Sequence, residues 1–333
     1  MSALIQVARS LRSLPGCTKL LLDINSDVGV GMANSLTRAG TSPPNVAVSG
    51  SGPAFQLDVK IASVAAGTAL GQATYQLSIN GGAFTAAAAT TGTPIALGNG
   101  WFIAFGTGTF NTNQTWKGAI VTVTNDAASN FTEPVCQCFG PIYTANARGG
   151  LPGFHFDTGY VYPGAGSGGQ IQSFSCTATT ATVDAPYTAI WTALYTATAG
   201  ATWSMGSNGV TDGSTFAFGA GGTTLNHVRR AGTTSLQTVH LWTFDSAWHV
   251  FAARYNGTQI EFWVDAAKVL SYTTIQSTGS GDMSNANMLR IGASYDDTTA
   301  PGDYQQFAMY QGLLTDYELA VATRAVQERY RFV

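Results

Sequence analysis

The chain has 333 residues, of which 45% are hydrophobic and only 10% are charged, and its formal net charge at pH 7 is −3. This composition excludes an intrinsically disordered chain, and the lack of a basic excess argues against binding to nucleic acid or to an anionic membrane surface. The length fits two domains or one large all-β domain. Low charge together with 39 glycines is typical of a rigid extracellular or particle-bound protein rather than of a cytosolic enzyme.

Residues 1–40 predict a helix, a strand and a linker. Apolar side chains recur at helical spacing along 3–14, so this amphipathic helix either packs on its own chain or docks on a neighbouring subunit. Arg9 and Arg12 interrupt the stretch, so we expect no secretory signal, and no apolar run elsewhere is long enough to cross a membrane. Residues 19–24 predict a buried strand. The sequence leaves open whether this strand joins the C-terminal domain, which would make the small domain an insertion.

Residues 41–125 are expected to form a small β-sandwich domain. The strands expected here are 55–61, 72–79, 101–105 and 116–123. Apolar and polar side chains alternate along the first two, which is the pattern of half-buried strands. Asn80-Gly81 predicts a tight turn, and Ala86–Thr91 predicts an exposed loop.

Residues 126–150 are expected to form a connector, and residues 151–333 a second β-rich domain that ends in a helix. The strands expected in this domain are 187–195, 236–244, 248–255, 259–264, 289–291 and 305–310. Asn256-Gly257 predicts a tight hairpin between two of them. Thr315 and Glu318 have the spacing of a capping box, which predicts that the terminal helix begins at Thr315.

The four cysteines predict no metal centre. Cys136 and Cys138 are separated by one residue, which is too close for the usual pair of zinc ligands. Buried thiols and disulfide bonds formed outside a cell both fit the spacing. The sequence leaves open whether Cys136 or Cys138 pairs with Cys17 or Cys176.

The C-terminal half carries an ordered set of motifs. The segment WHVFAARYNGTQIEFWVDA (Trp248–Ala266) contains a Trp-His strand, an Asn-Gly hairpin and a strand that ends in Val-Asp. The other motifs are GLPGFHFDTGYVY (Gly150–Tyr162), MLRIGASYDDT (Met288–Thr298) and YQQFAMYQGLLTDYELAVATRAVQERY (Tyr304–Tyr330). Together they resemble the laminin-G-like, concanavalin A-like sandwich family over about residues 141–333, which implies a jelly roll. The chain departs from this family at Ala266, where the family often has glycine.

The first domain is patterned on small residues. Its segments PNVAVSGSGPAFQLDVKIASVAAGTALGQATYQLSINGGAFT (Pro44–Thr85) and GWFIAFGTGTFNTNQTW (Gly100–Trp116) resemble small β domains of structural and tail proteins of tailed bacteriophages. The two resemblances imply an all-β fold of two β-sandwich domains, to which the sequence pattern adds short N- and C-terminal helices. They also imply a place on the virion surface, with capsid or tail proteins as partners. We expect a homo-oligomer, with a trimer favoured, and no membrane insertion.

The carboxylates predict no catalytic pair. Glycosidases that retain configuration place two carboxyl groups about 5 Å apart across the scissile bond. The four glutamates of the chain are Glu133, Glu261, Glu318 and Glu328. Glu261 has no glutamate partner on its strand, and Asp265, four residues further along, would lie about 13 Å away. His249, next to Trp248, is interpreted as a packing residue, so we expect no enzymatic activity.

Three aspartates are candidate ligands for calcium. Asp296, Asp297 and Asp303 cluster in one predicted loop, and carboxylate oxygens are the ligands that calcium prefers. Laminin-G-like modules often bind calcium at such a rim, so the resemblance favours the same site. A solvated polar loop is the alternative, and no other cofactor is expected.

Three aromatic residues are candidates for a sugar-stacking platform. They are Trp203, Tyr295 and Tyr304, and packing in the core is the alternative for each. Surface glycans are therefore candidate ligands.

The expected function is a non-enzymatic structural protein that decorates the capsid or tail of a phage particle. A carbohydrate-binding adhesin of the tail tip or fibre is the alternative, and a polysaccharide depolymerase is the least favoured one. The first two are compatible, because a decoration protein can display a lectin-like sandwich outwards.

Overall fold

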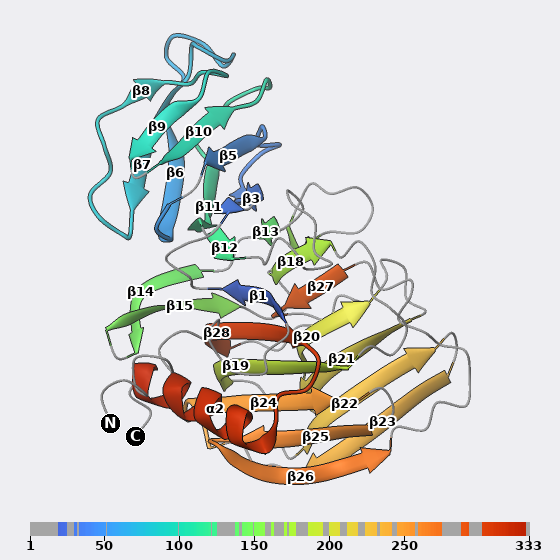
Figure 1. Ribbon diagram of the computed structural model, residues 1–333. Helices are drawn as coiled ribbons and strands as arrows, with labels where there is room; N and C mark the ends of the chain where they lie inside the picture. The colour runs from blue at the N-terminus through green and yellow to red at the C-terminus, as the bar shows by residue number, and fades with distance from the viewer. Residues whose placement is uncertain are drawn as a thin grey trace.

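The computed structural model describes a small β unit, a larger β-sandwich and the helix near the end of the chain (Figure 1). The described residues are 19–24, 30–31, 33–50, 52–98, 100–120, 122–124, 137–139, 142–148, 150–156, 161–162, 170–171, 173–177, 186–195, 200–206, 212–218, 224–231, 234–241, 245–256, 259–274, 288–292 and 302–330. Within these ranges no helix has the length and hydropathy needed to cross a membrane. The described fold is all-β apart from α2 (Asp316–Tyr330).

The first layer of the sandwich is a ten-stranded sheet. Its strands, in spatial order, are β2 (Val30–Gly31), β12 (Thr122–Thr124), β1 (Lys19–Ile24), β28 (Gly302–Gln311), β19 (Tyr187–Tyr195), β24 (His249–Tyr255), β25 (Gln259–Val264) and β26 (Ala267–Thr274). Off this path, β14 (Ile142–Arg148) pairs with β15 (Leu151–Phe156), which also pairs with β28. The pairings within this sheet are antiparallel.

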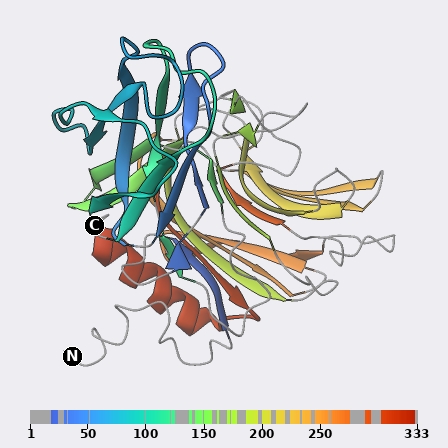
Figure 2. The same ribbon diagram turned by 90° about the horizontal axis from the view of Figure 1, so that it is seen from above.

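The second layer is part of an eleven-stranded sheet that continues into the small unit. Its order is β23 (Thr234–Leu241), β22 (Thr224–Ala231), β21 (Asp212–Phe218), β20 (Gly200–Gly206), β27 (Met288–Ile291), β18 (Ser173–Thr177), β13 (Gln137–Phe139), β3 (Ala33–Ser35), β5 (Val46–Gly50), β10 (Trp101–Phe105) and β9 (Ile95–Gly98). The two layers are seen from above in Figure 2. A separate pair is formed by β16 (Val161–Tyr162) and β17 (Gln170–Ile171).

The small unit, residues 36–120, closes the end of the eleven-stranded sheet with a second sheet of five strands. This sheet has the order β4 (Thr37–Ala39), β11 (Thr115–Ile120), β6 (Phe55–Ser63), β7 (Thr74–Ile79) and β8 (Ala88–Ala89). Alternate residues of β6 and β10 point inwards, and they bury an aromatic core that includes Trp101, Phe105 and Trp116. Phe105 contacts both Phe110 and Trp116 edge to face at 6.1 Å.

The small unit is inserted between strands of the sandwich. Strand β1 precedes the unit and pairs with β28, where Ile24 lies opposite Phe307. Strand β12 follows it and pairs with β1 and β2, so the chain leaves and re-enters the sandwich at neighbouring strands. The sequence leaves open whether strand 19–24 joins the C-terminal sandwich. The pairing of β1 with β28 shows that it does.

The two sandwich layers meet in a cluster of aromatic rings. Trp191 of β19 contacts Trp203 of β20 at 5.8 Å and stacks on Phe251 of β24 at 5.6 Å. Phe307 of β28 packs edge to face against Trp203 at 5.5 Å. These four side chains are no more than 1% exposed. Full burial of each ring removes well over about 100 Å² of apolar surface from water, so this cluster contributes strongly to the stability of the sandwich.

Helix α2 covers the outer face of the ten-stranded sheet. Leu319, Ala322 and Val326 of the helix pack against a sheet face that includes Ile190 and Val250. Because the sheet is covered on both sides, β19 is buried along almost its whole length, which explains its nearly continuous apolar sequence.

Several expected boundaries change in the structure. The strand predicted at 116–123 is two strands, because β11 belongs to the small unit while β12 pairs in the sandwich. The expected connector 126–150 contains β13 and β14, which pair with sandwich strands. The loop predicted at Ala86–Thr91 is exposed up to Ala89, but it includes β8, and Thr90 is buried with its hydroxyl 3.1 Å from the Ala73 carbonyl oxygen.

Some expectations fall outside the described residues. These are the N-terminal helix at 3–14, Cys17 and Cys136. The structure therefore leaves the cysteine pairing as a prediction.

Candidate functional site

Of the three candidate calcium ligands, the structure describes Asp303 alone. Its Oδ1 lies 2.7 Å from Nδ1 of His155, and both side chains are about a third exposed. Asp303 lies opposite His155 in the β15–β28 pairing, which is why the two side chains meet. Asp296 and Asp297 lie outside the described residues, and no group of three metal-binding side chains is found within the described ranges. A calcium site here stays a prediction.

The two described candidates for a sugar platform lie in the core. Trp203 and Tyr304 are 0% exposed. Tyr304 packs edge to face on Phe156 at 5.1 Å, and burial raises the pKa of its hydroxyl well above the ordinary value. Neither ring can stack on a ligand at the surface. Both residues pack in the core, which is the alternative that the sequence left open. Tyr295 lies outside the described residues.

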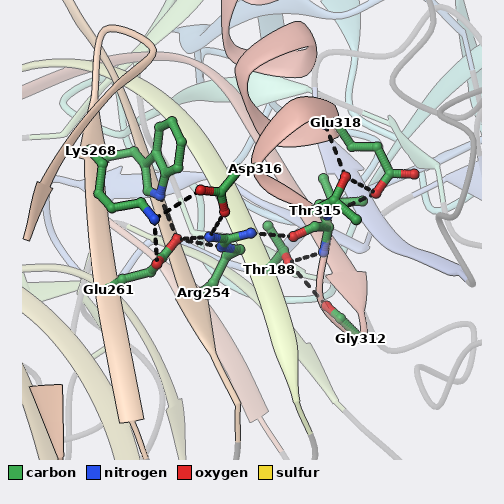
Figure 3. Close-up of polar contacts among 10 residues, drawn as sticks. Thr188, Arg254, Glu261, Lys268, Gly312, Thr315, Asp316 and Glu318 are labelled. Atoms are coloured by element: carbon green, nitrogen blue, oxygen red, sulfur yellow. Dashed lines mark hydrogen bonds and ion pairs between the residues drawn. The ribbon is translucent and has the colours of Figure 1, made fainter. Parts of the chain in front are cut away.

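A cluster of charged side chains lies where α2 begins, between the helix and the sheet (Figure 3). Arg254 of β24 and Glu261 of β25 face each other across the hairpin, and both are almost completely buried. Arg254 also donates to the Leu314 carbonyl oxygen at 2.5 Å and to Asp316 Oδ1 at 2.5 Å. Lys268 lies 2.9 Å from Asp316 and 3.4 Å from Glu261. The cluster therefore links the three strands β24, β25 and β26 to the first turn of α2.

The environment of Glu261 decides what this carboxylate can do. Its side chain is 0% exposed, and it accepts a hydrogen bond from Trp263 Nε1 at 2.5 Å in addition to its ion pairs. A carboxylate that is paired and sealed from solvent has no access to a substrate. Glu261 therefore serves to hold the strands and the helix together.

The first turn of α2 has the capping box that its sequence predicts. Thr315 Oγ1 accepts from the Glu318 amide at 3.2 Å, and Glu318 Oε2 accepts from the Thr315 amide at 2.8 Å. Leu314 and Leu319 are both buried in the cluster beneath the helix, at the positions of a hydrophobic staple. These contacts fix the angle at which the chain enters α2.

A second polar cluster surrounds His249 at the start of β24. The ring lies between two carboxylates, with Nδ1 2.5 Å from Asp265 Oδ2 and Nε2 2.9 Å from Asp245 Oδ1. Asp265 occupies the two-residue turn between β25 and β26, and its Oδ1 accepts from the Val250 amide at 3.0 Å. Gln327 of α2 donates to the same oxygen at 3.3 Å. Asp265 thus joins β24, the turn and the helix.

The charges in this cluster shift one another's titration. Burial lowers the pKa of His249, but the hydrogen bonds to Asp265 and Asp245 outweigh it, so the pKa is raised overall. The hydrogen bond to His249 lowers the pKa of Asp245. For Asp265, burial acts upwards, and the hydrogen bonds from His249 and Val250 lower the pKa overall. All three groups are therefore charged together over a range of mildly acidic pH.

The register of the hairpin between β24 and β25 brings this cluster together. Tyr255 pairs with Ile260, and the same register continued to the end of the strand brings Asp265 opposite Val250, next to His249. The two-residue turn that the sequence predicts at Asn256-Gly257 would instead pair Tyr255 with Thr258, which is a different register. Treating His249 as a packing residue overlooked its two carboxylate partners.

Four large apolar side chains are exposed among the described residues: Phe84, Phe102, Leu313 and Tyr317. Tyr317 is the most exposed, at 69%, and follows Asp316 in the first turn of α2. Phe84 carries the ammonium of Lys60 over its ring at 4.0 Å.

Phe102 lies on an uncharged face of the small unit. It points away from the core between the buried Trp101 and Ile103, and it is paired with Ser49 and Ala96, which are also exposed. Between residues 39 and 120 the only charged residues are Asp58, Lys60 and Lys117, and all three lie on the five-stranded sheet. The opposite sheet of the unit, formed by β5, β10 and β9, carries no charge.

No protein-family model matches the chain, and no curated protein matches it. One similar solved structure is domain 4 of AbnA, a GH43 extracellular arabinanase from Geobacillus stearothermophilus, in complex with arabinotriose. It is 10% identical with a TM-score of 0.42, and the match covers 60% of this chain and 91% of that domain. Another is CBM40 of the Ruminococcus gnavus IT-sialidase bound to α2,6-sialyllactose. It is 13% identical with a TM-score of 0.34, and the match covers 42% of this chain and 83% of that one.

A third similar structure is that of botulinum neurotoxin type C, described with its interaction with two ganglioside molecules. It is 6% identical with a TM-score of 0.39, and the match covers 53% of this chain and 43% of that one. Because the three TM-scores are below 0.5, the ligands of these proteins carry no inference for this chain. The assignment to the all-β sandwich class rests on the pairing of the strands described above.

Proposed function

We propose that this chain is a non-enzymatic structural protein on the surface of a tailed-phage particle, where it decorates the capsid or the tail. The observation that carries the proposal is the uncharged outer face of β5, β10 and β9, with Phe102 40% exposed at its centre. A face without charge costs less to desolvate than a charged one, so it suits permanent contact with another protein. The resemblance of residues 44–85 and 100–116 to small phage domains supports the same role.

The insertion of the small unit adds a mechanical argument. Two chain crossings and the shared eleven-stranded sheet connect the unit to the sandwich. A unit held in this way can attach to a shell while it keeps the sandwich in a defined orientation. In this arrangement the sandwich projects into the medium, and copies of the chain assemble with the symmetry of their site.

The proposed lack of enzymatic activity is supported by the state of the described carboxylates. Glu261 is enclosed in its ion pairs, Glu318 caps α2, and Asp265 is bound to His249 and Val250. Glu261 shares the guanidinium of Arg254 with Asp316, but its own side chain is 0% exposed and so has no access to a sugar. Release of reducing sugar from a host polysaccharide by the purified chain, above a heat-treated control, would contradict this part of the proposal.

The direct test is to locate the chain in purified particles by cryo-electron microscopy and to measure its occupancy. Phe102→Ser is expected to lower occupancy at least several-fold, because it removes the apolar centre of the proposed contact. Phe84→Ser is the matched control, since Phe84 is exposed to the same degree, at 42%, but packs beside Lys60 of the other sheet. Purified particles that lack this chain would contradict the proposed role. Equal occupancy for Phe102→Ser and Phe84→Ser would contradict the proposed contact face.

A second candidate function is binding to surface glycans, and Tyr317 favours it. Tyr317 is 69% exposed in the first turn of α2. An exposed tyrosine offers a ring on which a sugar can stack and a hydroxyl that can form a hydrogen bond with it. On a glycan array, Tyr317→Ala is expected to abolish binding that Phe84→Ala retains. The same binding by both variants would exclude this site.

A further inference from the structure

We propose that Asp245, His249 and Asp265 form a pH-operated clasp, which holds the segment 245–248 against the sandwich while the imidazole is protonated and releases Asp245 when it is neutral. The geometry is that of an imidazolium with a carboxylate at each nitrogen, at 2.5 and 2.9 Å. The proposed contact face on β5, β10 and β9 does not include this cluster, so the clasp and the decoration role are tested separately.

Only the protonated ring can serve both carboxylates. An imidazolium has two N–H donors, whereas a neutral imidazole has one donor and one lone pair. Loss of the proton therefore leaves one carboxylate facing a lone pair at hydrogen-bond distance. That contact is repulsive, so one of the two carboxylates moves away.

The surroundings decide that Asp245 is the carboxylate that leaves. Asp265 is also held by the Val250 amide and by Gln327, and its side chain is 36% exposed. The side chain of Asp245 is 56% exposed, and its other hydrogen bond is to the Ala247 amide within the same segment. Water can solvate Asp245 at little cost. The neutral ring is therefore expected to keep its proton on Nδ1, towards Asp265.

The charged groups around the ring come from each element packed against it. The segment before β24 contributes Asp245, and the turn after β25 contributes Asp265; these are the charges that act on His249. Helix α2 contributes the neutral Gln327, through Asp265, and β24 contributes the ring of Phe251 at 5.9 Å. The two carboxylates lie at opposite nitrogens, so a single metal ion could not bind all three side chains.

The direction of the pH effect follows from the shifts. The raised pKa of His249 means that the clasp contributes its full stability below the ordinary histidine value of about 6.5 and loses it as pH rises through the folded-state pKa. The lowered pKa values of Asp245 and Asp265 mean that their contribution is present above about 3.9 and is lost as pH falls through their folded-state values. The clasp is closed between these limits.

The test is an NMR titration of the histidine rings in the full chain, with His249→Gln used to assign the His249 signals. The expected result is a His249 pKa above the ordinary value in the native protein and a lower one in Asp245→Asn. Each pKa unit by which the native protein exceeds Asp245→Asn means that Asp245 favours the protonated ring over the neutral one about tenfold. Asp303→Asn is the matched control, because Asp303 pairs with His155 instead.

The imidazole nitrogen shifts supply the second measurement. They are expected to place the proton of the neutral ring on Nδ1. Thermal unfolding of native protein and Asp245→Asn is expected to differ most at mildly acidic pH and to converge as pH rises through the His249 titration. A pKa unchanged by Asp245→Asn, or a neutral ring protonated on Nε2, would overturn the proposal.

Discussion

Arg254 is the residue on which the charged cluster beneath α2 depends. It binds Glu261, the Leu314 carbonyl oxygen and Asp316 at once. Arg254→Met is expected to lower the free energy of unfolding by about 3 kcal/mol, because it leaves Glu261 buried with Lys268 as its remaining cation. Urea denaturation followed by tryptophan fluorescence measures the loss.

The matched control replaces both partners. Arg254→Met combined with Glu261→Leu removes the buried charge as well as its partner, so it is expected to recover most of the stability lost in the single variant. Asp316→Asn changes a side chain that is 62% exposed and is expected to cost less than about 1 kcal/mol. A double variant no more stable than the single one would show that the cluster is not held by charge pairing.

Ala266 occupies a backbone conformation that favours glycine. Val264 and Ala267 are paired, so Asp265 and Ala266 form a two-residue hairpin turn, with φ of +49° and +63°. Ala266→Gly is expected to raise the free energy of unfolding by about 1 kcal/mol, because it removes the steric cost of the left-handed conformation. Ala267→Gly, one residue later in β26, is expected to lower it by about 0.5–1 kcal/mol. Equal effects of the two variants in urea denaturation would contradict this account.

At the scale of the element, the start of α2 is set by its capping box. Thr315→Ala is expected to cost about 1 kcal/mol, because the Glu318 amide loses its acceptor at the helix terminus. Thr315→Ser keeps the hydroxyl and is expected to be close to the native protein. Thermal unfolding monitored by circular dichroism separates the two, and equal midpoints would show that the hydroxyl does not contribute.

The same elements show how far local sequence patterns reach. The strands at 187–195 and 259–264 and the cap of α2 follow the sequence because periodicity, turn residues and capping residues act over a few neighbours. Strand β12 does not follow its pattern, because the change of sheet after β11 depends on pairing with β1, about a hundred residues earlier. Patterns within one segment carry no information about such partners.

The candidate sites also show which features a local sequence pattern predicts and which it does not. Trp203 and Tyr304 have residue types that suit both a sugar platform and a core, and only the packing of the two layers decides in favour of the core. Asp303 meets His155, 148 residues earlier, through the register of β28 with β15. Asp265 meets His249 through the register of the consecutive strands β24 and β25, which the expected turn does not give. The residue types were visible in the sequence, but their partners were not.

At the scale of the whole molecule, the sandwich is predicted to fold without the small unit. Gly31 of β2 lies opposite Thr122 of β12, so an Asn-Gly turn can join these two residues and close the gap left by the insertion. The shortened chain is expected to keep the near-ultraviolet circular dichroism of the aromatic cluster around Trp191. It is expected to unfold at a lower temperature, because β13 loses its β3 partner. Loss of the aromatic signal would show that the two units fold only together.

The pairing of β1 with β28 also determines when the ten-stranded sheet can be completed during synthesis. Strand β1 begins at Lys19, and its partner ends at Gln311, so the first of the described strands to leave the ribosome must wait for the last of them. The small unit is contiguous between Leu36 and Ile120 and can complete its core early in synthesis. During translation, the inserted unit is therefore finished while β1 still has an unpaired edge. The last strand and α2 close the ten-stranded sheet on a preformed unit.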